Sequence, residues 1–176
     1  HDGLHRTVFH VHECSGGQLA MLSRGERRVL NECDVPLSQM FKTSGGKYIV
    51  PQQLESKIVE SSFIEQVMVI GESRKFPAAL IVPNYTNLLA WSKNSSPSLA
   101  ELPKIEFLNS PEVRKEIESE LNRNNQNFGT WEQIKKFAII PNEMTIETGE
   151  LTPTLKMKRK IILQKYEKEV EAIYNT

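Results

Sequence analysis

The sequence predicts an α+β domain, in which a small three-stranded sheet with a short hairpin beside it is flanked by amphipathic helices. Three apolar runs have the length of strands, at residues 67–70, 78–82 and 137–141. Other segments repeat apolar residues every four positions, which is typical of helices that bury one face. A chain of 176 residues can bury one sizeable core. We therefore expect one compact domain with an extension.

The first 40 residues show poor periodicity and predict a linker or extension. His10, His12 and Cys14 alternate, so on a strand they would share one face. They lack a convincing fourth ligand at a useful spacing. We therefore expect no metal site in the chain.

A pair of adjacent glycines, Gly45 and Gly46, opens the ordered part of the chain. Such a pair lets the backbone turn tightly or lie close to a ligand, although an ordinary turn has the same pattern. A short strand is expected at residues 48–50, and Pro51 suits the first turn of a helix that runs to about Glu60. The first two apolar runs then predict a hairpin that is buried on both faces.

The second half of the chain alternates helices with the third strand. A helix is expected at residues 85–93 and a surface loop at 94–103, which contains Ser-Ser-Pro-Ser. Ser110 can cap the next helix, and Pro111 suits its first position. The last helix follows the third strand and carries its apolar residues on one side, at Ile162, Tyr166, Val170 and Ile173.

A turn at residues 149–160 leads into the last helix and carries three lysines and an arginine in its final five positions. Its glycine, proline and threonines predict a tethered loop. Lys156 is the candidate for chemistry, because an ammonium on a flexible stem can contact a phosphate or a developing oxyanion. Two other interpretations stay open, a solvated basic run and a nuclear-localisation pattern.

Composition excludes several classes of protein. Lys plus Arg and Asp plus Glu each number 22, so no overall field attracts nucleic acid, and we expect no nucleic-acid partner. Two cysteines are too few for a disulfide scaffold and favour a reducing, intracellular setting. We find no signal-peptide pattern and no apolar run long enough to span a membrane. We expect a cytoplasmic protein, whose membrane contact, if any, is peripheral or through another part of a larger protein.

Two motifs together resemble the C-terminal domain of the adenylate-forming (AMP-binding) superfamily, and within it the long-chain fatty-acid–CoA ligases. Residues 41–55, Phe-Lys-Thr-Ser-Gly-Gly-Lys-Tyr-Ile-Val-Pro-Gln-Gln-Leu-Glu, resemble the family's loop and helix after the hinge, and residues 67–83 resemble its two sheet strands. Residues 151–159 resemble its C-terminal lysine loop. The resemblance makes residues 41–176 the mobile C-terminal domain. It matches residues 1–40 poorly and leaves them as an extension on the hinge side.

The resemblance implies a role for particular residues. Lys156 stands at the position of the catalytic lysine, and Gly45, Gly46 and Lys47 stand in the loop that lines the CoA channel. Glu26 matches the charged hinge residue if residues 29–40 are treated as an insertion. The implied reaction joins a fatty acid to ATP as an acyl-adenylate with release of pyrophosphate, assisted by Mg²⁺, and CoA then displaces AMP.

The resemblance also implies a partner, the larger N-terminal adenylation domain of the same polypeptide, which carries the phosphate loop and the acyl tunnel. We therefore expect this chain to be inactive alone and to bind neither ATP nor CoA by itself. Two alternatives remain at this point. One is a non-catalytic binding or regulatory module of the same fold, and the other is a relative that activates a different carboxylate.

Overall fold

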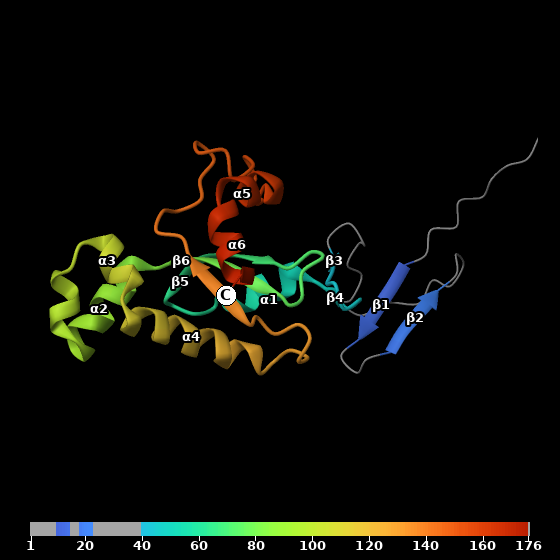
Figure 1. The fold of residues 1–176 in the computed structure, drawn as a ribbon, viewed down its shortest axis with the longest axis horizontal. Coiled ribbons are helices and arrows are strands. Elements are labelled where there is room, and N and C mark those ends of the chain that lie inside the picture. Colours follow the sequence, from blue (N-terminus) through green and yellow to red (C-terminus); the bar gives the residue numbers. More distant parts are fainter. Residues whose placement is uncertain (1–9, 15–17, 23–39, 176) are drawn as a thin grey trace, which may run out of the picture.

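The computed structural model describes residues 10–14, 18–22 and 40–175 (Figure 1). In the first two of these segments it describes only the backbone, in which β1 (His10–Cys14) pairs antiparallel with β2 (Gln18–Leu22). This hairpin is not expected from the sequence, because neither strand alternates strictly between polar and apolar residues.

A three-stranded sheet forms the centre of the domain, in the order β5-β6-β7. β5 (Ile64–Ile70) pairs antiparallel with β6 (Ala78–Pro83), and β7 (Lys136–Ile139) joins β6 in parallel. Every residue of β6 is buried, as expected for a central strand covered on both faces. The three predicted strands are confirmed. β5 begins at Ile64 rather than at residue 67, because two polar residues interrupt its apolar run.

Helices cover both faces of the sheet, and each face has its own apolar core (Figure 1). Side chains alternate along β6, so that Ala79 and Ile81 belong to one core and Leu80 and Val82 to the other. The first core includes residues of α1 (Pro51–Ile58), α2 (Tyr85–Ser95), α3 (Lys104–Asn109) and α4 (Pro111–Asn125). The second includes residues of α5 (Arg159–Lys165) and α6 (Glu167–Asn175). The α+β prediction is confirmed.

The helix that matters most for the site, α1, follows a short hairpin. In that hairpin β3 (Phe41–Lys42) pairs antiparallel with β4 (Tyr48–Ile49). Pro51 holds the first turn of α1, and Leu54 and Ile58 bury the helix face that packs against β5. The strand-to-helix unit predicted here is confirmed. The predicted Ser110 cap of α4 is confirmed as well, since its hydroxyl accepts the N–H of Val113.

Two expectations about the helices are wrong. Residues 94–103 are not a loop throughout, because α2 continues to Ser95 and a 3-10 helix, η2, spans Pro97–Glu101. Leu99 of η2 packs in the first core, which the polar composition of this stretch does not indicate. The predicted last helix is two helices, α5 and α6, interrupted at Tyr166. None of the described helices is both long enough and apolar enough to cross a bilayer.

Candidate functional site

Residues 150–158, here called the lysine loop, form a small hairpin that presents Lys156. At its base, Leu151 and Met157 form an antiparallel bridge, and the N–H of Lys158 donates to the carbonyl oxygen of Glu150 at 2.8 Å. Nearer the tip, the N–H of Thr152 donates to the carbonyl oxygen of Lys156 at 2.8 Å, and the N–H of Lys156 donates to Thr152 Oγ1 at 3.0 Å. The tethered loop predicted from the sequence is confirmed.

The tip of the lysine loop is exposed. Lys156 is exposed, and no acidic side chain of the described residues forms an ion pair with its ammonium. Leu155 beside it is 69% exposed and has a φ of 60°, in the left-handed region, which costs a non-glycine residue about 1–2 kcal/mol. An exposed leucine in a strained conformation adds little to folding stability, and such residues cluster at functional sites.

An open groove of about 990 Å³ runs beside the lysine loop. Its walls come from α1, β5, the lysine loop and the start of α5. Four basic side chains and two acidic ones line it, which leaves a net positive charge: Lys156, Lys158, Arg159, Lys160, Glu55 and Glu65. Exposed apolar residues also line it, at Val59, Leu155 and Ile161. A groove of this kind can contact a surface or ligand that carries both anionic and apolar groups.

Arg159 fixes the end of the lysine loop to the sheet and to α1. Its Nη1 donates to the carbonyl oxygen of Val69 at 2.8 Å, and its Nη2 donates to Glu55 Oε1 at 2.5 Å. The same Glu55 oxygen accepts the N–H of Val69 at 2.8 Å. Val69 lies on β5, an outer strand of the sheet, so the Arg159–Glu55 pair occupies backbone groups that an edge strand would otherwise leave unpaired.

Glu150 places a wholly buried carboxylate at the base of the lysine loop. Its Oε1 lies 2.8 Å from Lys165 Nζ and accepts the Tyr166 hydroxyl at 3.0 Å. Its Oε2 accepts the Thr148 hydroxyl and, at 3.4 Å, the N–H of Thr145. Burial by itself would raise the pKa of Glu150, but these hydrogen bonds outweigh burial and hold the pKa below its ordinary value of 4.5. The hydrogen bond to Glu150 raises the pKa of Lys165, so the two form a charged pair at neutral pH.

Residues 43–47, here called the glycine loop, connect β3 to β4. The N–H of Gly46 donates to the carbonyl oxygen of Thr43 at 2.9 Å, and Gly46 has a φ of 83°, which favours glycine. The N–H of Ser44 donates to the carbonyl oxygen of Arg74 at 2.9 Å, which ties the loop to the turn between β5 and β6. A Cβ built on Gly45 would meet nothing within 4 Å. The backbone at Gly45 is therefore open to a ligand.

The ammonium of Lys47 lies 5.5 Å from the centre of the Trp131 ring, a cation–π contact. The groove that Lys156 lines does not include Gly45, Gly46 or Lys47. The lysine loop and the glycine loop therefore do not line this groove together.

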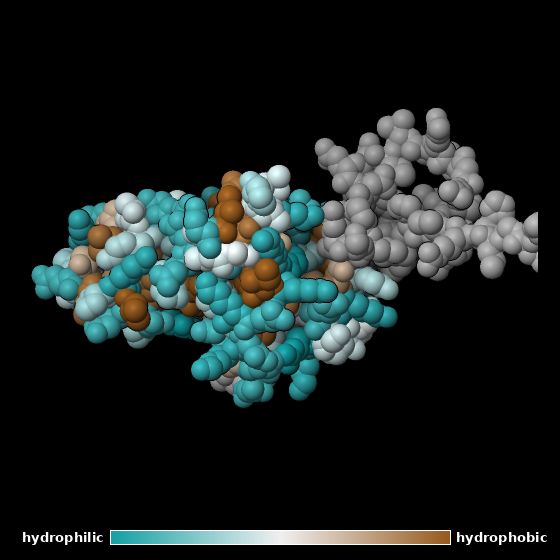
Figure 2. All heavy atoms as spheres, turned by 90° about the horizontal axis from the view of Figure 1, so that it is seen from above, coloured by the Kyte–Doolittle hydropathy of each residue, from teal (hydrophilic) through white to brown (hydrophobic). Residues whose placement is uncertain are grey.

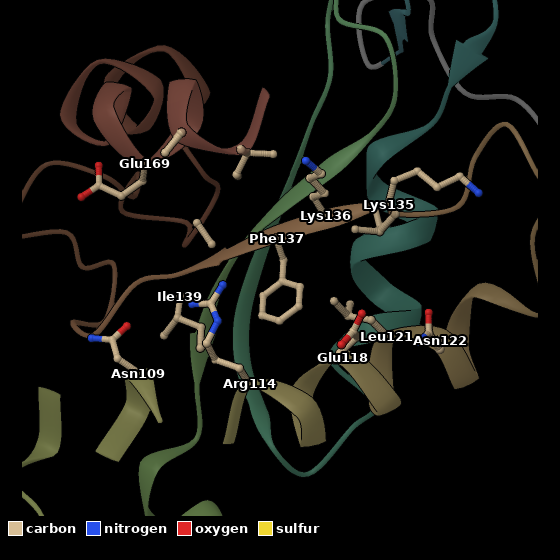
Figure 3. Close-up of a pocket in the computed structure, with 14 residues that line it drawn as sticks. Asn109, Arg114, Glu118, Leu121, Asn122, Lys135, Lys136, Phe137, Ile139 and Glu169 are labelled. Carbon is tan, nitrogen blue, oxygen red and sulfur yellow. The ribbon is translucent and has the colours of Figure 1, made fainter. Parts of the chain in front are cut away.

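A second hollow, of about 560 Å³, lies between α4, β7 and α6 (Figure 3). Arg114 lies over the ring of Phe137, with 5.4 Å between the guanidinium carbon and the ring centre. Glu118 and Glu169 come from the helices on either side (Figure 3). No predicted site residue lines this hollow.

Other sequence-based site expectations fall partly outside the described residues. Glu26 and the side chains of His10, His12 and Cys14 lie outside them. Among the described residues, no group of three or more His, Cys, Asp or Glu side chains is arranged to hold a metal ion.

Three residues of the site were not predicted from the sequence: Glu55, Glu150 and Tyr166. Glu55 and Arg159 stand 104 positions apart, so no local pattern joins them. For Glu150, the only signal in the sequence is an acidic residue at the start of a strongly basic segment.

The chain matches the model of one protein family. The model of the AMP-binding enzyme C-terminal domain matches residues 39–176. Long-chain-fatty-acid–CoA ligase FadD15 of Mycobacterium tuberculosis is 34% identical over 137 residues, which are 78% of this chain and 23% of that protein. Long-chain-fatty-acid–CoA ligase 1 of Cavia porcellus is 30% identical over 140 residues, which are 78% of this chain and 20% of that protein. The chain thus spans about a fifth of the length of these relatives.

Solved structures share the fold. The adenylation domain of the carboxylate reductase from Mycobacterium chelonae has a TM-score of 0.64 at 20% identity, over 94% of this chain and 22% of that one. The A domain of carboxylic acid reductase from Segniliparus rugosus, in complex with AMP and a co-purified carboxylic acid, has a TM-score of 0.64 at 21% identity, over the same shares of the two chains. The family resemblance expected from the lysine and glycine motifs is confirmed, and the chain belongs to the family of AMP-binding enzyme C-terminal domains, with long-chain-fatty-acid–CoA ligases among its homologues.

Proposed function

We propose that the chain is the mobile C-terminal domain of a long-chain fatty-acid–CoA ligase and supplies Lys156 for acyl-adenylate formation. One observation carries the proposal. The lysine loop holds its backbone with its own hydrogen bonds while the Lys156 ammonium extends into solvent with no acidic partner among the described residues. A charge presented in this way is available to a ligand, because it does not first have to leave a partner.

In the first half-reaction, a carboxylate oxygen of the fatty acid bonds to the α-phosphorus of ATP, and pyrophosphate leaves. Negative charge redistributes over the oxygens of the reacting groups. A preorganised ammonium at those oxygens stabilises the transition state, and removing one such contact commonly costs about 100-fold or more in rate, roughly 3 kcal/mol. Mg²⁺, when bound, would offset phosphate charge, and we assign no described residue to it.

In the second half-reaction, the CoA sulfur bonds to the acyl carbon, and AMP leaves. We propose that the domain rotates between the two steps and exchanges the lysine loop for the glycine loop at the active site. This division of labour is supported by the lining of the groove beside Lys156, which includes no residue of the glycine loop. The open space at Gly45 supports a place for the extended thiol arm of CoA, because no side chain fills it.

The remaining sites belong, under this proposal, to a larger adenylation domain of the same polypeptide. The part of the chain that matches these relatives covers 23% and 20% of their length. On the face seen in Figure 2, apolar side chains form separate brown patches within a mainly teal surface. Such a surface suits a contact that forms and breaks, since permanent interfaces are more apolar. The cytoplasmic location, with any membrane contact made by the rest of the enzyme, remains a prediction.

Pyrophosphate release by the complete enzyme tests the proposal. Lys156→Ala should slow ATP-dependent and fatty-acid-dependent release by about 100-fold or more. Lys168→Ala is the matched control, because Lys168 is an exposed lysine of α6 that does not line the groove beside the lysine loop. Equal rates for wild type and Lys156→Ala would refute the role of Lys156. Equal losses in the two variants would mean that overall charge, and not position, accounts for the effect.

A further inference from the structure

We propose that Glu150 is a positioning residue for Lys156, which holds the lysine loop in the geometry needed for adenylation. This inference rests on the proposed function of Lys156. Glu150 is assigned the role of fixing the lysine loop, and Lys156 keeps the role of contacting the reacting groups.

The first support is the burial of a charge. Glu150 is wholly buried, and each of its carboxylate oxygens is occupied by the contacts with Lys165, Tyr166, Thr148 and Thr145. Taking a carboxylate out of water is costly, and an apolar side chain of similar size often serves folding as well. Buried polar networks that are fully satisfied can instead select one conformation among several.

The second support is the position of Glu150 in the chain. It is the first residue of the lysine loop, and its carbonyl oxygen accepts the N–H of Lys158, the last residue of that loop. Its own N–H donates to the carbonyl oxygen of Thr145 at 3.2 Å. The backbone of Glu150 therefore closes the loop, while its side chain attaches the closure to other elements.

The third support is the set of elements that the carboxylate joins. Thr145 and Thr148 belong to the turn that precedes the loop, while Lys165 and Tyr166 stand where α5 ends. The break between α5 and α6 falls at Tyr166, whose hydroxyl bonds to Glu150. One carboxylate thus fixes both the segment that enters the loop and the helix that leaves it.

Lys156 depends on this framework because its only described hydrogen bonds are made by its backbone, to Thr152 within the same loop. Its ammonium has no anchor of its own among the described residues. A shift of the loop base would move the ammonium with it, and a displacement of about 1 Å at a reacting group can cost on the order of 100-fold in rate.

Hydrogen exchange on the 176-residue chain tests the loop directly, without any assumption about function. Glu150→Gln removes the charge and keeps the shape. Exchange should speed up by about tenfold or more at the amides of Thr152, Leu155 and Lys158, with little change in β5 and β6. Glu143→Gln is the matched control, since Glu143 is an exposed carboxylate of the same connecting segment. Unchanged loop exchange, or equal acceleration throughout the chain, would overturn the proposal.

A milder variant keeps the test decisive if Glu150→Gln fails to fold. Tyr166→Phe removes one hydroxyl that donates to Glu150 and leaves the ring in place. It should accelerate exchange at the same amides to a smaller extent. The same accelerated exchange spread over the whole domain would count against a positioning role.

In the complete enzyme, Glu150→Gln should slow pyrophosphate release by between about 10- and 100-fold. Transfer of a supplied acyl-adenylate to CoA should stay within about twofold of wild type, and Glu150→Gln should add less than about twofold to the loss already caused by Lys156→Ala. A full further loss in the double variant would show that Glu150 acts independently of Lys156. If Lys156→Ala alone has no effect, the proposed function fails, and hydrogen exchange still decides whether Glu150 orders the loop.

Discussion

The contact of Arg159 with Glu55 and Val69 gives a prediction whose size follows from the structure. Arg159→Met removes two charge-assisted hydrogen bonds, at 2.8 Å and 2.5 Å, and keeps most of the aliphatic stem. Such bonds contribute about 1.5–3 kcal/mol each when buried. The Arg159 side chain is 39% exposed and that of Glu55 16%, so solvent screening lowers the sum, and we expect a loss of about 2 kcal/mol of unfolding free energy.

Thermal unfolding of the chain measures this loss. For a domain of this size, 1 kcal/mol lowers Tm by about 2–4 °C, so Arg159→Met should lower it by about 4–8 °C. The matched control is Lys57→Met, which removes the exposed Lys57–Glu60 pair of the same α1 region and should change Tm by less than about 2 °C. Glu55→Gln should add little to Arg159→Met, because both changes disrupt one pair. Equal small shifts for Arg159→Met and Lys57→Met would refute the anchoring role of Arg159.

Two further predictions concern the glycine loop and pH. In the complete enzyme, Gly46→Ala should impair thioester formation more than pyrophosphate release, because the φ of 83° costs a residue with a side chain about 1–2 kcal/mol and distorts the loop. Gly45→Ala should fold normally, since a Cβ at Gly45 meets nothing within 4 Å. Equal loss of both half-reactions in Gly46→Ala would indicate a folding role for Gly46. Because the pKa of Glu150 is lowered, its contribution to stability is fully present above the ordinary value of 4.5 and is lost as the pH falls through the folded-state value. The raised pKa of Lys165 makes its contribution present below 10.5 and lost as the pH rises through its folded-state value. The difference in unfolding free energy between wild type and Glu150→Gln should therefore be constant between these limits and shrink in acid; a difference that grows in acid would contradict the sign.

The strands of the central sheet could be predicted because runs of consecutive apolar residues in the sequence indicate buried strands. β6 is buried on both faces, so its continuous apolar run identifies it as a strand without reference to the strands beside it. The cap at Ser110 and the proline at the start of α1 are likewise local features. The interruption at Tyr166 could not be predicted, because the helical spacing continues through it and its hydroxyl bonds to Glu150, 16 positions away.

The residues of the candidate site likewise fall into those that the sequence predicts and those that it does not. Lys156 and the two glycines stand out because their residue types and spacing are recognisable in the sequence. The residues that hold the lysine loop do not, since Arg159 and Glu55 meet across 104 positions and Glu150 has no pattern that indicates burial. Charged residues are mostly exposed, so sequence alone favours the wrong environment for Glu150.

The most direct test of the account supplies the acyl-adenylate to the complete Lys156→Ala enzyme together with CoA and follows thioester formation. If the lysine loop serves adenylation and leaves the active site before transfer, this variant should form thioester at a rate within about threefold of wild type, although its pyrophosphate release has fallen by about 100-fold or more. A loss of thioester formation as large as the loss of pyrophosphate release would contradict the division of the two steps between the lysine loop and the glycine loop.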